Sequence, residues 1–402
     1  MHIQNPPVPH NWQVQNYSFK IIKMSLFKGI KKAAGSIVPS PIQIDFKKGG
    51  VRRIQEVAPY PKEVFWDDTV TIHKTAEGIE YVRTPEERFE NLPGYDFAPN
   101  YVEIEGMRMH YLDEGPKDGP IILLLHGQPV WSFLYRKMIK ELVPKGYRCI
   151  APDMMGMGKS DKPIKEAFHY YDRHCEMMLT FIHKMKLSNI TAFVQDWGSL
   201  IGTRLVGENP DLFARVVLAN GDLPLMTEAT NPLYIPNPVV VNPKIKSVKD
   251  IAKHWLKGMP DMFQAWILYC LQNTRNFIGF TMQQSTEKTL TDAEMAAYDA
   301  PFPSFIYMAG PRTLPSMNVA LVGQQLPAWE SLKKFEKPFI SFIGLQDTLL
   351  GLPRIQEKWI NSVPGAKGQA HEQFEKANHF IQEDIGEIMA DRVHKFIVKN
   401  PV

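Results

Sequence analysis

Short apolar runs alternate with stretches of helical length along most of this 402-residue chain. Four of the runs, each bounded by Gly, Asp or Asn, are Ile121–Leu125, Arg148–Pro152, Ile190–Val194 and Val216–Ala219. The stretches that separate them, such as Asp172–Lys186 and Ser199–Gly207, are long enough to form helices. Because parallel strands need long crossover connections, this alternation predicts an α/β fold with a mainly parallel sheet flanked by helices.

Further strands are expected on both sides of this region. The segments Tyr101–Gly106 and Met107–Gly115 have the pattern of an antiparallel hairpin that precedes the parallel strands. Towards the C-terminus, a strand is expected at Pro338–Gly344 and a last strand is expected to end at His379. A closing helix is predicted over Ile385–Val398.

The strand pattern is interrupted between Asp222 and about Gln325. This region is rich in Pro, Met and aromatic residues, and helical stretches are expected around Val248–Leu256 and Asp261–Leu271. We therefore expect three parts, which are an N-terminal and partly flexible extension at residues 1–80, a core at residues 81–222 and 326–402, and a helical cap inserted at residues 223–325.

The N-terminal extension has a composition of its own. It has no Asp or Glu before Asp45, and the lysine-rich stretch Met24–Val38 is compatible with a basic amphipathic helix. An organelle presequence and a membrane-surface helix are two functional interpretations of such a helix. An ordinary solvated extension is favoured, because presequences usually carry arginine and the first arginine here is Arg52.

The overall composition argues against several classes of partner. A net charge of +3 is too small to indicate nucleic-acid binding, and no apolar run approaches the roughly 18 residues that span a bilayer. Cys149, Cys175 and Cys270 are an odd set without CxxC spacing, which favours a reducing compartment. We therefore expect a cytoplasmic protein without an integral membrane span, with organelle targeting through the basic N-terminus as the alternative.

Asp196 stands where a predicted buried strand ends and a predicted helix begins, in the segment Val194–Gly198 (VQDWG). This setting resembles the nucleophile elbow of α/β-hydrolases, a sharp turn that usually holds a serine above the sheet. A carboxylate suits attack on an sp³ carbon, which forms an alkyl ester, and does not suit acyl transfer, which would form an anhydride. The competing interpretation is an Asp that only caps the helix N-terminus.

Two further residues favour a catalytic interpretation. Asp347 follows the predicted strand after the insertion, and His379 follows the last predicted strand. The chain order is therefore nucleophile, acid and histidine, as in α/β-hydrolases. His379 is expected to act as the general base on the hydrolytic water, and Asp347 to orient it and stabilise its charged form.

An ester intermediate also needs hydrogen-bond donors for the oxyanion that forms when water attacks its carbonyl. The backbone N–H of Trp197, directly after the nucleophile, is one candidate. The backbone N–H of Gln128 is the other, because the loop His126–Pro129 follows an apolar strand at the place where this fold has its second donor.

Five motifs in register resemble the haloalkane dehalogenases, within the subgroup whose catalytic acid follows the first strand after the cap. They are His126–Arg136 (HGQPVWSFLYR), Asp153–Pro163 (DMMGMGKSDKP), Val194–Gly198 (VQDWG), Gly344–Asp347 (GLQD) and His379–Glu383 (HFIQE). The resemblance runs from about Tyr81 to about Lys399. It implies an α/β-hydrolase fold with a helical cap, a small apolar halogenated substrate, water as co-substrate and a halide ion as product.

The resemblance also implies a halide site made of two indole N–H groups. Trp197 matches the position after the nucleophile, and Trp266 lies in the cap segment Phe263–Trp266 (FQAW), which resembles that of the subgroup. Trp255 is the rival for the second position. Indole suits this role because it donates a hydrogen bond, accepts none and has an apolar body.

No metal or organic cofactor is needed for this chemistry. His169 and His174 are not arranged as a metal motif, and both are expected at a solvated helix start. Two positions depart from the family pattern: Ser199 stands where a second glycine is common, and Gln128 replaces the acidic or Asn side chain that is often present. Altered helix packing and altered water positioning are the expected consequences.

Other activities remain open at this point. An epoxide hydrolase shares the fold and the Asp chemistry and needs cap tyrosines, for which Tyr234, Tyr269 and Tyr298 are the candidates. A luciferase-like oxygenase and a catalytically silent binding protein are the lesser alternatives. The QDW elbow together with the HGQP loop favours dehalogenation.

Overall fold

The computed structural model describes residues 43–45, 50–52, 70–224, 266–267, 269–271, 278–317 and 323–401. Every described element belongs to one unit of the chain, residues 41–402. Several features predicted above lie outside the described residues, among them the basic segment Met24–Val38, Tyr234, and the helical stretch Val248–Leu256 with Trp255.

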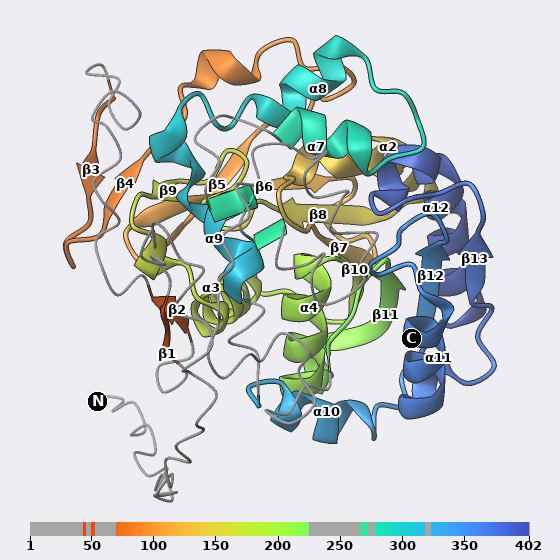
Figure 1. The fold of residues 1–402 in the computed structure, drawn as a ribbon. Coiled ribbons are helices and arrows are strands. Elements are labelled where there is room, and N and C mark those ends of the chain that lie inside the picture. The colour runs from red at the N-terminus through yellow and green to blue at the C-terminus, as the bar shows by residue number, and fades with distance from the viewer. Residues whose placement is uncertain are drawn as a thin grey trace, which may run out of the picture. The chain divides into compact units, whose positions relative to one another are not determined.

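Eight strands form the central sheet, in the order β13-β12-β11-β10-β7-β8-β6-β5 (Figure 1). Their bounds are β5 Asn100–Ile104, β6 Met107–Glu114, β7 Ile121–Leu125, β8 Arg148–Pro152, β10 Ile190–Gln195, β11 Phe213–Ala219, β12 Phe339–Gly344 and β13 Glu372–Phe374. The six strands from β13 to β8 in this order are parallel. β5 and β6 form an antiparallel hairpin that pairs with β8, so the predicted mainly parallel sheet and its hairpin are confirmed.

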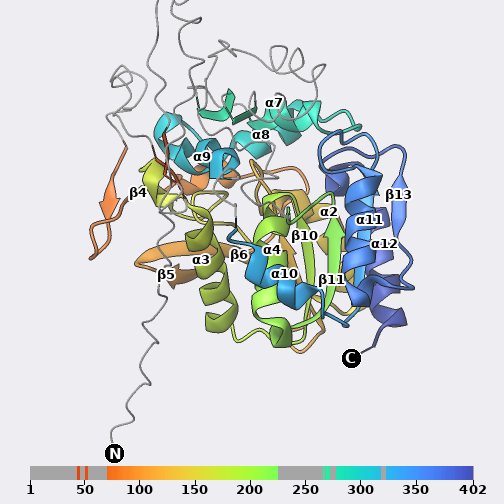
Figure 2. The same cartoon turned by 60° about the horizontal axis from the view of Figure 1, so that its bottom comes forward.

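Helices connect the parallel strands and cover the sheet. They are α2 Arg136–Leu142, α3 Tyr171–Lys184, α4 Trp197–Glu208, α10 Leu326–Leu332, α11 Pro353–Ser362 and α12 Ile381–Lys399. The chain runs from β7 to β8 and then crosses back over β7 to β10. Because crossovers are right-handed, this reversal places α2 on one face and α3 and α4 on the other. In agreement, α2 packs against α12, and α4 packs against α3 and α10 (Figures 1 and 2).

The same reversal positions the candidate site. Where crossovers on either side of a parallel sheet diverge, a crevice opens at the carboxyl ends of the strands. Gln128 follows β7 and Asp196 follows β10, the two strands at the reversal, and Asp347 and His379 follow β12 and β13. All four predicted residues therefore lie at the same edge of the sheet.

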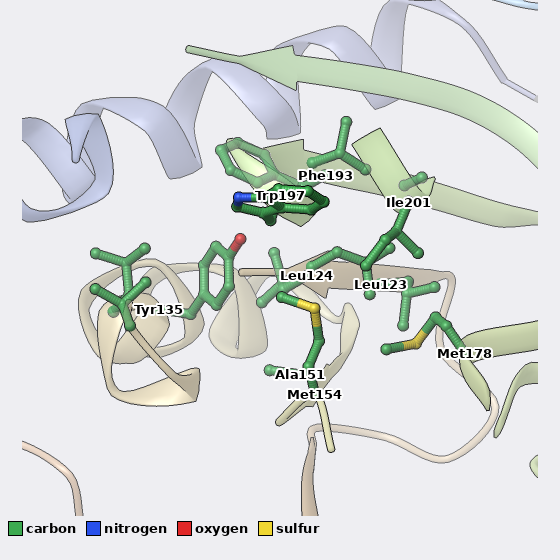
Figure 3. Close-up of a cluster of buried hydrophobic side chains, with 14 of the residues drawn as sticks. Leu123, Leu124, Tyr135, Ala151, Met154, Met178, Phe193, Trp197 and Ile201 are labelled. Carbon is green, nitrogen blue, oxygen red and sulfur yellow. The ribbon is translucent and has the colours of Figure 1, made fainter. Parts of the chain in front are cut away.

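Buried apolar side chains fill the space between the sheet and its helices (Figure 3). Leu123 and Leu124 of β7, Phe193 of β10 and Ile201 of α4 are each at most 1% exposed. Burying one such side chain stabilises the fold by roughly 1.5–3 kcal/mol relative to leaving it exposed. Parallel strands need apolar side chains on both faces, which explains why these strands read as continuous apolar runs.

Helices also occupy the described part of the insertion between β11 and β12. They are α7 Ile278–Gln284, α8 Asp292–Asp299 and α9 Ala309–Met317, and residues 266–267 and 269–271 are helical as well. α8 begins with a capping box, in which Thr291 and Glu294 bond to each other's backbone N–H groups. None of the described residues between 223 and 325 is in a strand. No helix in the described ranges is both long and apolar enough to cross a membrane.

Two small sheets lie outside the central one. β1 Gln43–Asp45 and β2 Gly50–Arg52 pair antiparallel with each other. β3 His73–Lys74, β4 Glu80–Val82 and β9 Lys162–Pro163 form a three-stranded sheet. The sequence places residues 70–80 in the extension. In the structure, strand β3 of this segment pairs with β4, and β4 pairs with β9, which follows β8 in the chain.

Three sequence-based expectations are wrong in detail. β13 ends at Phe374, so His379 lies in a loop and not at a strand end. The closing helix α12 begins at Ile381, four residues before the predicted start at Ile385. The non-helical Ile385 separates this additional first turn from the rest of the helix. His169 and His174 are buried, at 2% and 3% exposure, and not solvated, because the ring of His174 in the first turn of α3 stacks on and hydrogen-bonds to the ring of His169.

Candidate active site

Asp196 sits on a strained turn between β10 and α4. Its φ of 47° and ψ of −123° lie in a region that non-glycine residues seldom adopt. It occupies the N-cap position of α4, yet its side chain makes no capping hydrogen bond. Strain of this kind is kept where the surroundings hold it and is typical of functional sites. The side chain is therefore available for a role other than capping.

Small residues make room for this turn. A Cβ at Gly127 would lie 2.4 Å from the Cβ of Asp196, and a Cβ at Gly221 would lie 2.5 Å from that of Ser199. Ser199 donates to the backbone oxygen of Asp196 over 2.5 Å and accepts from the N–H of Asp222 over 2.9 Å. The serine that replaces the second elbow glycine is thus accommodated by Gly221 and fastens the turn to the end of β11.

Two sides of the Asp196 carboxylate have different neighbours. Its Oδ1 accepts the backbone N–H of Gln128 over 2.7 Å, and the backbone N–H of Trp197 also favours the ionised carboxylate. Its Oδ2 lies 3.6 Å from Nε2 of His379. Burial raises the pKa of Asp196 above its ordinary value, although the nearby imidazole and the two N–H groups offset part of that effect.

Asp347 holds the imidazole of His379. Its Oδ2 lies 2.9 Å from Nδ1, and its Oδ1 accepts the N–H groups of Leu349 and Leu350 over 2.8 and 3.0 Å. Burial opposes ionisation of Asp347, but the attraction to His379 and these hydrogen bonds outweigh it and keep the pKa of Asp347 low. A carboxylate only accepts hydrogen bonds, so Nδ1 carries the proton and Nε2 faces Asp196 with its lone pair.

The pKa of His379 is raised above the ordinary histidine value. Burial acts against the charged imidazole, and the two carboxylates of Asp347 and Asp196 more than compensate for it. The side chains of Asp196 and His379 are each 15% exposed.

Sequence reasoning missed two residues of this arrangement. Asn220 directly follows β11, donates from Nδ2 to Asp347 Oδ2 over 2.8 Å and accepts the N–H of Gly344 over 2.8 Å. Gln195 precedes Asp196, and its Nε2 lies 3.1 Å from the backbone oxygen and 3.3 Å from Nε2 of His379. The signal for both was available, because each is a polar residue at the end of an apolar strand that leads to the site.

The side chain of Gln128 turns away from Asp196. Its Nε2 donates to the backbone oxygen of Pro311 in α9 over 2.7 Å and contacts the sulfur of Cys270 at 3.8 Å. Any effect of Gln128 on water positioning therefore does not act through a direct contact between its side chain and Asp196. Its amide instead connects the loop after β7 to the insertion.

Trp197 and Trp266 have different surroundings. Trp197 is 4% exposed and packs into the apolar cluster of Figure 3. Within the part of the chain that the structure describes, no residue accepts from its indole N–H. Trp266 is half-buried, stacks on Tyr269 at 5.8 Å between ring centroids, and lies four residues before Cys270 on the same helical face. Because Cys270 contacts Gln128, this face is directed at the loop that bonds to Asp196.

The chain is similar to several known proteins. A family model described as the alpha/beta hydrolase fold matches residues 120–384. A haloalkane dehalogenase from Mycobacterium marinum is 40% identical over 325 residues, which are 78% of this chain and 99% of that protein. One from Psychrobacter cryohalolentis is 38% identical over 334 residues, which are 80% of this chain and 100% of that protein. The chain belongs to the haloalkane dehalogenase family.

Solved structures of haloalkane dehalogenases are similar to this family member. A tetrameric one from Paraglaciecola agarilytica has a TM-score of 0.64 at 27% identity and covers 79% of this chain and 97% of its own. A loop variant of a haloalkane dehalogenase from Bradyrhizobium elkanii has a TM-score of 0.61 at 22% identity, with 76% and 97% coverage, and supports the fold alone. The family resemblance and the fold class predicted from the sequence are confirmed.

The structure also places two of the three tyrosines that an epoxide hydrolase would need in the cap. Tyr298, one candidate acid for an epoxide hydrolase, donates its hydroxyl to the buried carboxylate of Glu383 over 2.6 Å. Tyr269 is buried beside Trp266, and Tyr234 lies outside the described residues. Among the described residues, no group of three His, Cys, Asp or Glu side chains is arranged to bind a metal ion.

Proposed function

We propose that this dehalogenase hydrolyses small apolar haloalkanes through a covalent alkyl ester on Asp196. One observation carries the proposal. Asp196 stands on a strained turn with a backbone N–H on one carboxylate oxygen, and with His379, held by Asp347, 3.6 Å from the other.

In the first step, Asp196 displaces the halide. Gln128 holds Oδ1 through its N–H, so Oδ2 is the oxygen that attacks the halogen-bearing carbon. The new C–O bond forms as the carbon–halogen bond breaks, and the halide leaves with the bonding electron pair. We assign the indole N–H of Trp197 to the departing halide, because Trp197 follows the nucleophile and its indole N–H has no acceptor among the described residues. Trp266 is the proposed second donor.

In the second step, water hydrolyses the ester. His379 accepts a proton from the water through Nε2, and the hydroxide oxygen attacks the carbonyl carbon of Asp196. The N–H groups of Gln128 and Trp197 stabilise the oxyanion that forms at Oδ1. Collapse of this intermediate breaks the bond to the alkoxy oxygen, which takes the proton from His379 and leaves as the alcohol. Asp196 is released as the carboxylate and one proton passes to solvent.

The insertion is the proposed cap of this site. α9 bonds to Gln128 through Pro311, and Cys270 contacts the same side chain. We propose the boundaries that the sequence suggests, with residues 223–325 as the cap, residues 81–222 and 326–402 as the core, and residues 1–80 as an extension. A cap of helices over the carboxyl ends of the strands excludes water from the first step, which strengthens the electrostatic interactions there.

The first test is halide release from 1-bromobutane and 1,2-dibromoethane by purified protein, with Asp196→Ala as the control. Release that disappears in the variant is the expected result. A folded wild-type protein that releases no halide from any haloalkane in a wider panel would refute the activity.

The ester itself is tested by trapping. In a His379→Phe variant the first step is expected to proceed and the second to stop, because the general base is absent. Mass spectrometry of this variant after exposure to 1-bromobutane is expected to show one added butyl group on the peptide that contains Asp196. An unmodified peptide, with halide still released, would rule out the covalent route.

A further inference from the structure

Residues 378–380 form the loop that leads into α12, and each of their backbone N–H groups donates a hydrogen bond to a side chain or to the insertion. The N–H of Asn378 donates to Oδ2 of Asp384 over 2.8 Å. The N–H of His379 donates to the side-chain oxygen of Asn378 over 2.8 Å, and that of Phe380 donates to the backbone oxygen of Ser285 over 3.3 Å. The loop that presents the imidazole is therefore fixed by side chains and by the insertion.

The other oxygen of Asp384 is bonded to the insertion. Its Oδ1 accepts the N–H groups of Glu287 and Lys288 over 2.8 and 2.9 Å, in the turn between α7 and α8. Asn378 adds a second link, because its Nδ2 donates to the carboxylate of Glu287 over 2.9 Å. One carboxylate thus joins the residue before His379 to the α7–α8 turn.

Asp384 is itself firmly placed. It belongs to the first turn of α12, which the non-helical Ile385 (φ −138°, ψ 39°) separates from the rest of the helix. The preceding Glu383 is fully buried and bonds to Arg136, Lys137 and Tyr298. A charge-assisted network of this kind restricts the turn to one orientation.

We propose that Asp384 is a positioning residue that holds the His379 imidazole in register with Asp196 and couples it to the α7–α8 turn of the insertion. This inference rests on the role of His379 proposed above. No other part of the proposed mechanism uses Asp384, which does not contact the reacting atoms. Its effect passes through the backbone of Asn378 and His379.

The two steps of the reaction depend on this positioning to different extents. Alkylation of Asp196 requires no proton transfer and is expected to tolerate a displaced imidazole. Hydrolysis requires Nε2 of His379 to reach the attacking water, and a displacement of about 1 Å costs on the order of 100-fold in rate. A loss of Asp384 should therefore slow hydrolysis selectively, whereas general destabilisation of the fold would slow both steps.

Asp384→Asn is the sharpest variant. The amide keeps the shape of the carboxylate and has one acceptor oxygen, which is expected to stay with the two N–H groups of Glu287 and Lys288. Its NH₂ group then faces the N–H of Asn378, so the loss falls on the side of His379. Asn378→Ala, which removes the acceptor of the His379 N–H, tests the same connection by a second route.

Rapid-quench halide release with 1,2-dibromoethane separates the two steps. We expect Asp384→Asn to keep a burst of one halide per active site and to lose 10- to 100-fold in the steady-state rate that follows. Asp391→Asn serves as the matched control, because Asp391 lies on α12, is 40% exposed and, among the described residues, forms ion pairs with Arg392 and Lys395 alone. Equal slowing of burst and steady state in Asp384→Asn, or no change in either, would overturn the proposal.

A second measurement does not depend on turnover. The imidazole of His379 is titrated by NMR in wild type and variants, and its signal is assigned by its loss in His379→Phe. A displaced ring loses contact with Asp347, so the pKa of His379 is expected to fall towards the ordinary value in Asp384→Asn and to stay unchanged in Asp391→Asn. An unchanged titration in Asp384→Asn would refute the positioning role. Absence of halide release by the wild-type protein would instead refute the proposed function, and the titration would still test the positioning role.

Discussion

At the scale of single residues, the two carboxylates of the site are distinguished by their neighbours. Asp347 faces four donors, namely His379, Asn220 and the N–H groups of Leu349 and Leu350, and its pKa is lowered. The pKa of Asp196 is raised, because burial outweighs the donors that it has. These shifts suit the proposed roles, in which Asp347 stays ionised and orients the base. Asp196 is the less stabilised anion of the two, as the proposed nucleophile should be.

The first prediction concerns the pH dependence of the two steps. Hydrolysis needs neutral His379, whose pKa is raised above 6.5, so its rate is expected to fall as pH drops through that raised value. Alkylation needs only ionised Asp196 and is expected to continue to lower pH. Rapid-quench halide measurements from pH 5 to 9 give both profiles. Asp347→Asn removes the anion that raises the pKa, so it is expected to shift the hydrolysis profile to lower pH, and a shift to higher pH would contradict this account.

The second prediction concerns the proposed halide donors Trp197 and Trp266. Trp266→Phe removes one hydrogen bond to an anion, which is worth about 1.5–3 kcal/mol and corresponds to roughly 10- to 150-fold weaker bromide binding. The measurement is the inhibition constant of bromide in the halide-release assay with a chlorinated substrate. Trp255→Phe is the matched variant and is expected to bind bromide as the wild type does. A loss in Trp255→Phe and none in Trp266→Phe would reverse the assignment.

At the scale of elements, the start of α12 joins the core to the insertion. Glu383 bonds to Arg136 over 2.6 Å and to Lys137 over 2.6 Å in α2, and it accepts the hydroxyl of Tyr298 in α8. Arg136 in turn bonds to Glu294 of α8 over 2.9 Å. These attractions lower the pKa of Glu383 to about 2 despite its burial, which by itself favours the neutral acid. α2, α8 and α12 are thereby tied together at one buried point.

The third prediction tests this buried network. Glu383→Gln removes the buried carboxylate that Arg136 and Lys137 share, and breaking a buried ion pair in this way costs about 3–5 kcal/mol in the free energy of unfolding. Urea unfolding at pH 7.5 measures the change. Glu330→Gln, which breaks an exposed pair with Lys333 on α10, is the control and is expected to have little effect. Equal stabilities of Glu383→Gln and wild type would show that the network contributes nothing.

At the scale of the whole molecule, two buried histidines are expected to make the fold sensitive to acid. The rings of His169 and His174, at the start of α3, hydrogen-bond to each other over 3.2 Å. Burial lowers the pKa of His169 to about 4 and that of His174 well below 6.5, where the mutual repulsion of the two rings adds to the effect. The unfolded chain therefore binds protons below pH 6.5 that the folded protein does not bind.

The fourth prediction follows from the sign of that difference. Because the folded pKa values are depressed, stability is expected to fall as pH drops from 6.5 towards 4, by up to about 1.4 kcal/mol per pH unit for each group. His174→Gln removes one titrating ring and is expected to flatten this slope in urea unfolding between pH 7.5 and 5. His183→Gln, on the exposed face of α3, is the control. A slope that His174→Gln leaves intact would assign the acid sensitivity to other groups.

The sequence by itself determined the architecture and the order of the candidate catalytic residues. Apolar runs such as Ile121–Leu125 and Ile190–Val194 are local signals, because a strand buried on both faces must be apolar throughout. The turn at Asp196 and the polar residues that follow later strands are local signals too. Parallel strands bring their carboxyl ends to one edge, so positions in sequence were enough to place Asp196, Asp347 and His379 together.

The tertiary structure alone decided which partners these residues have. Asn220 supports Asp347 across 127 positions, and Asp384 binds the turn at Glu287 across 97. No periodicity encodes such pairs, because they depend on how strands and helices pack and not on the residues next to them. The burial of His169 and His174 was missed for the same reason. Whether a polar side chain faces water or another side chain is decided by elements that meet only in the folded chain.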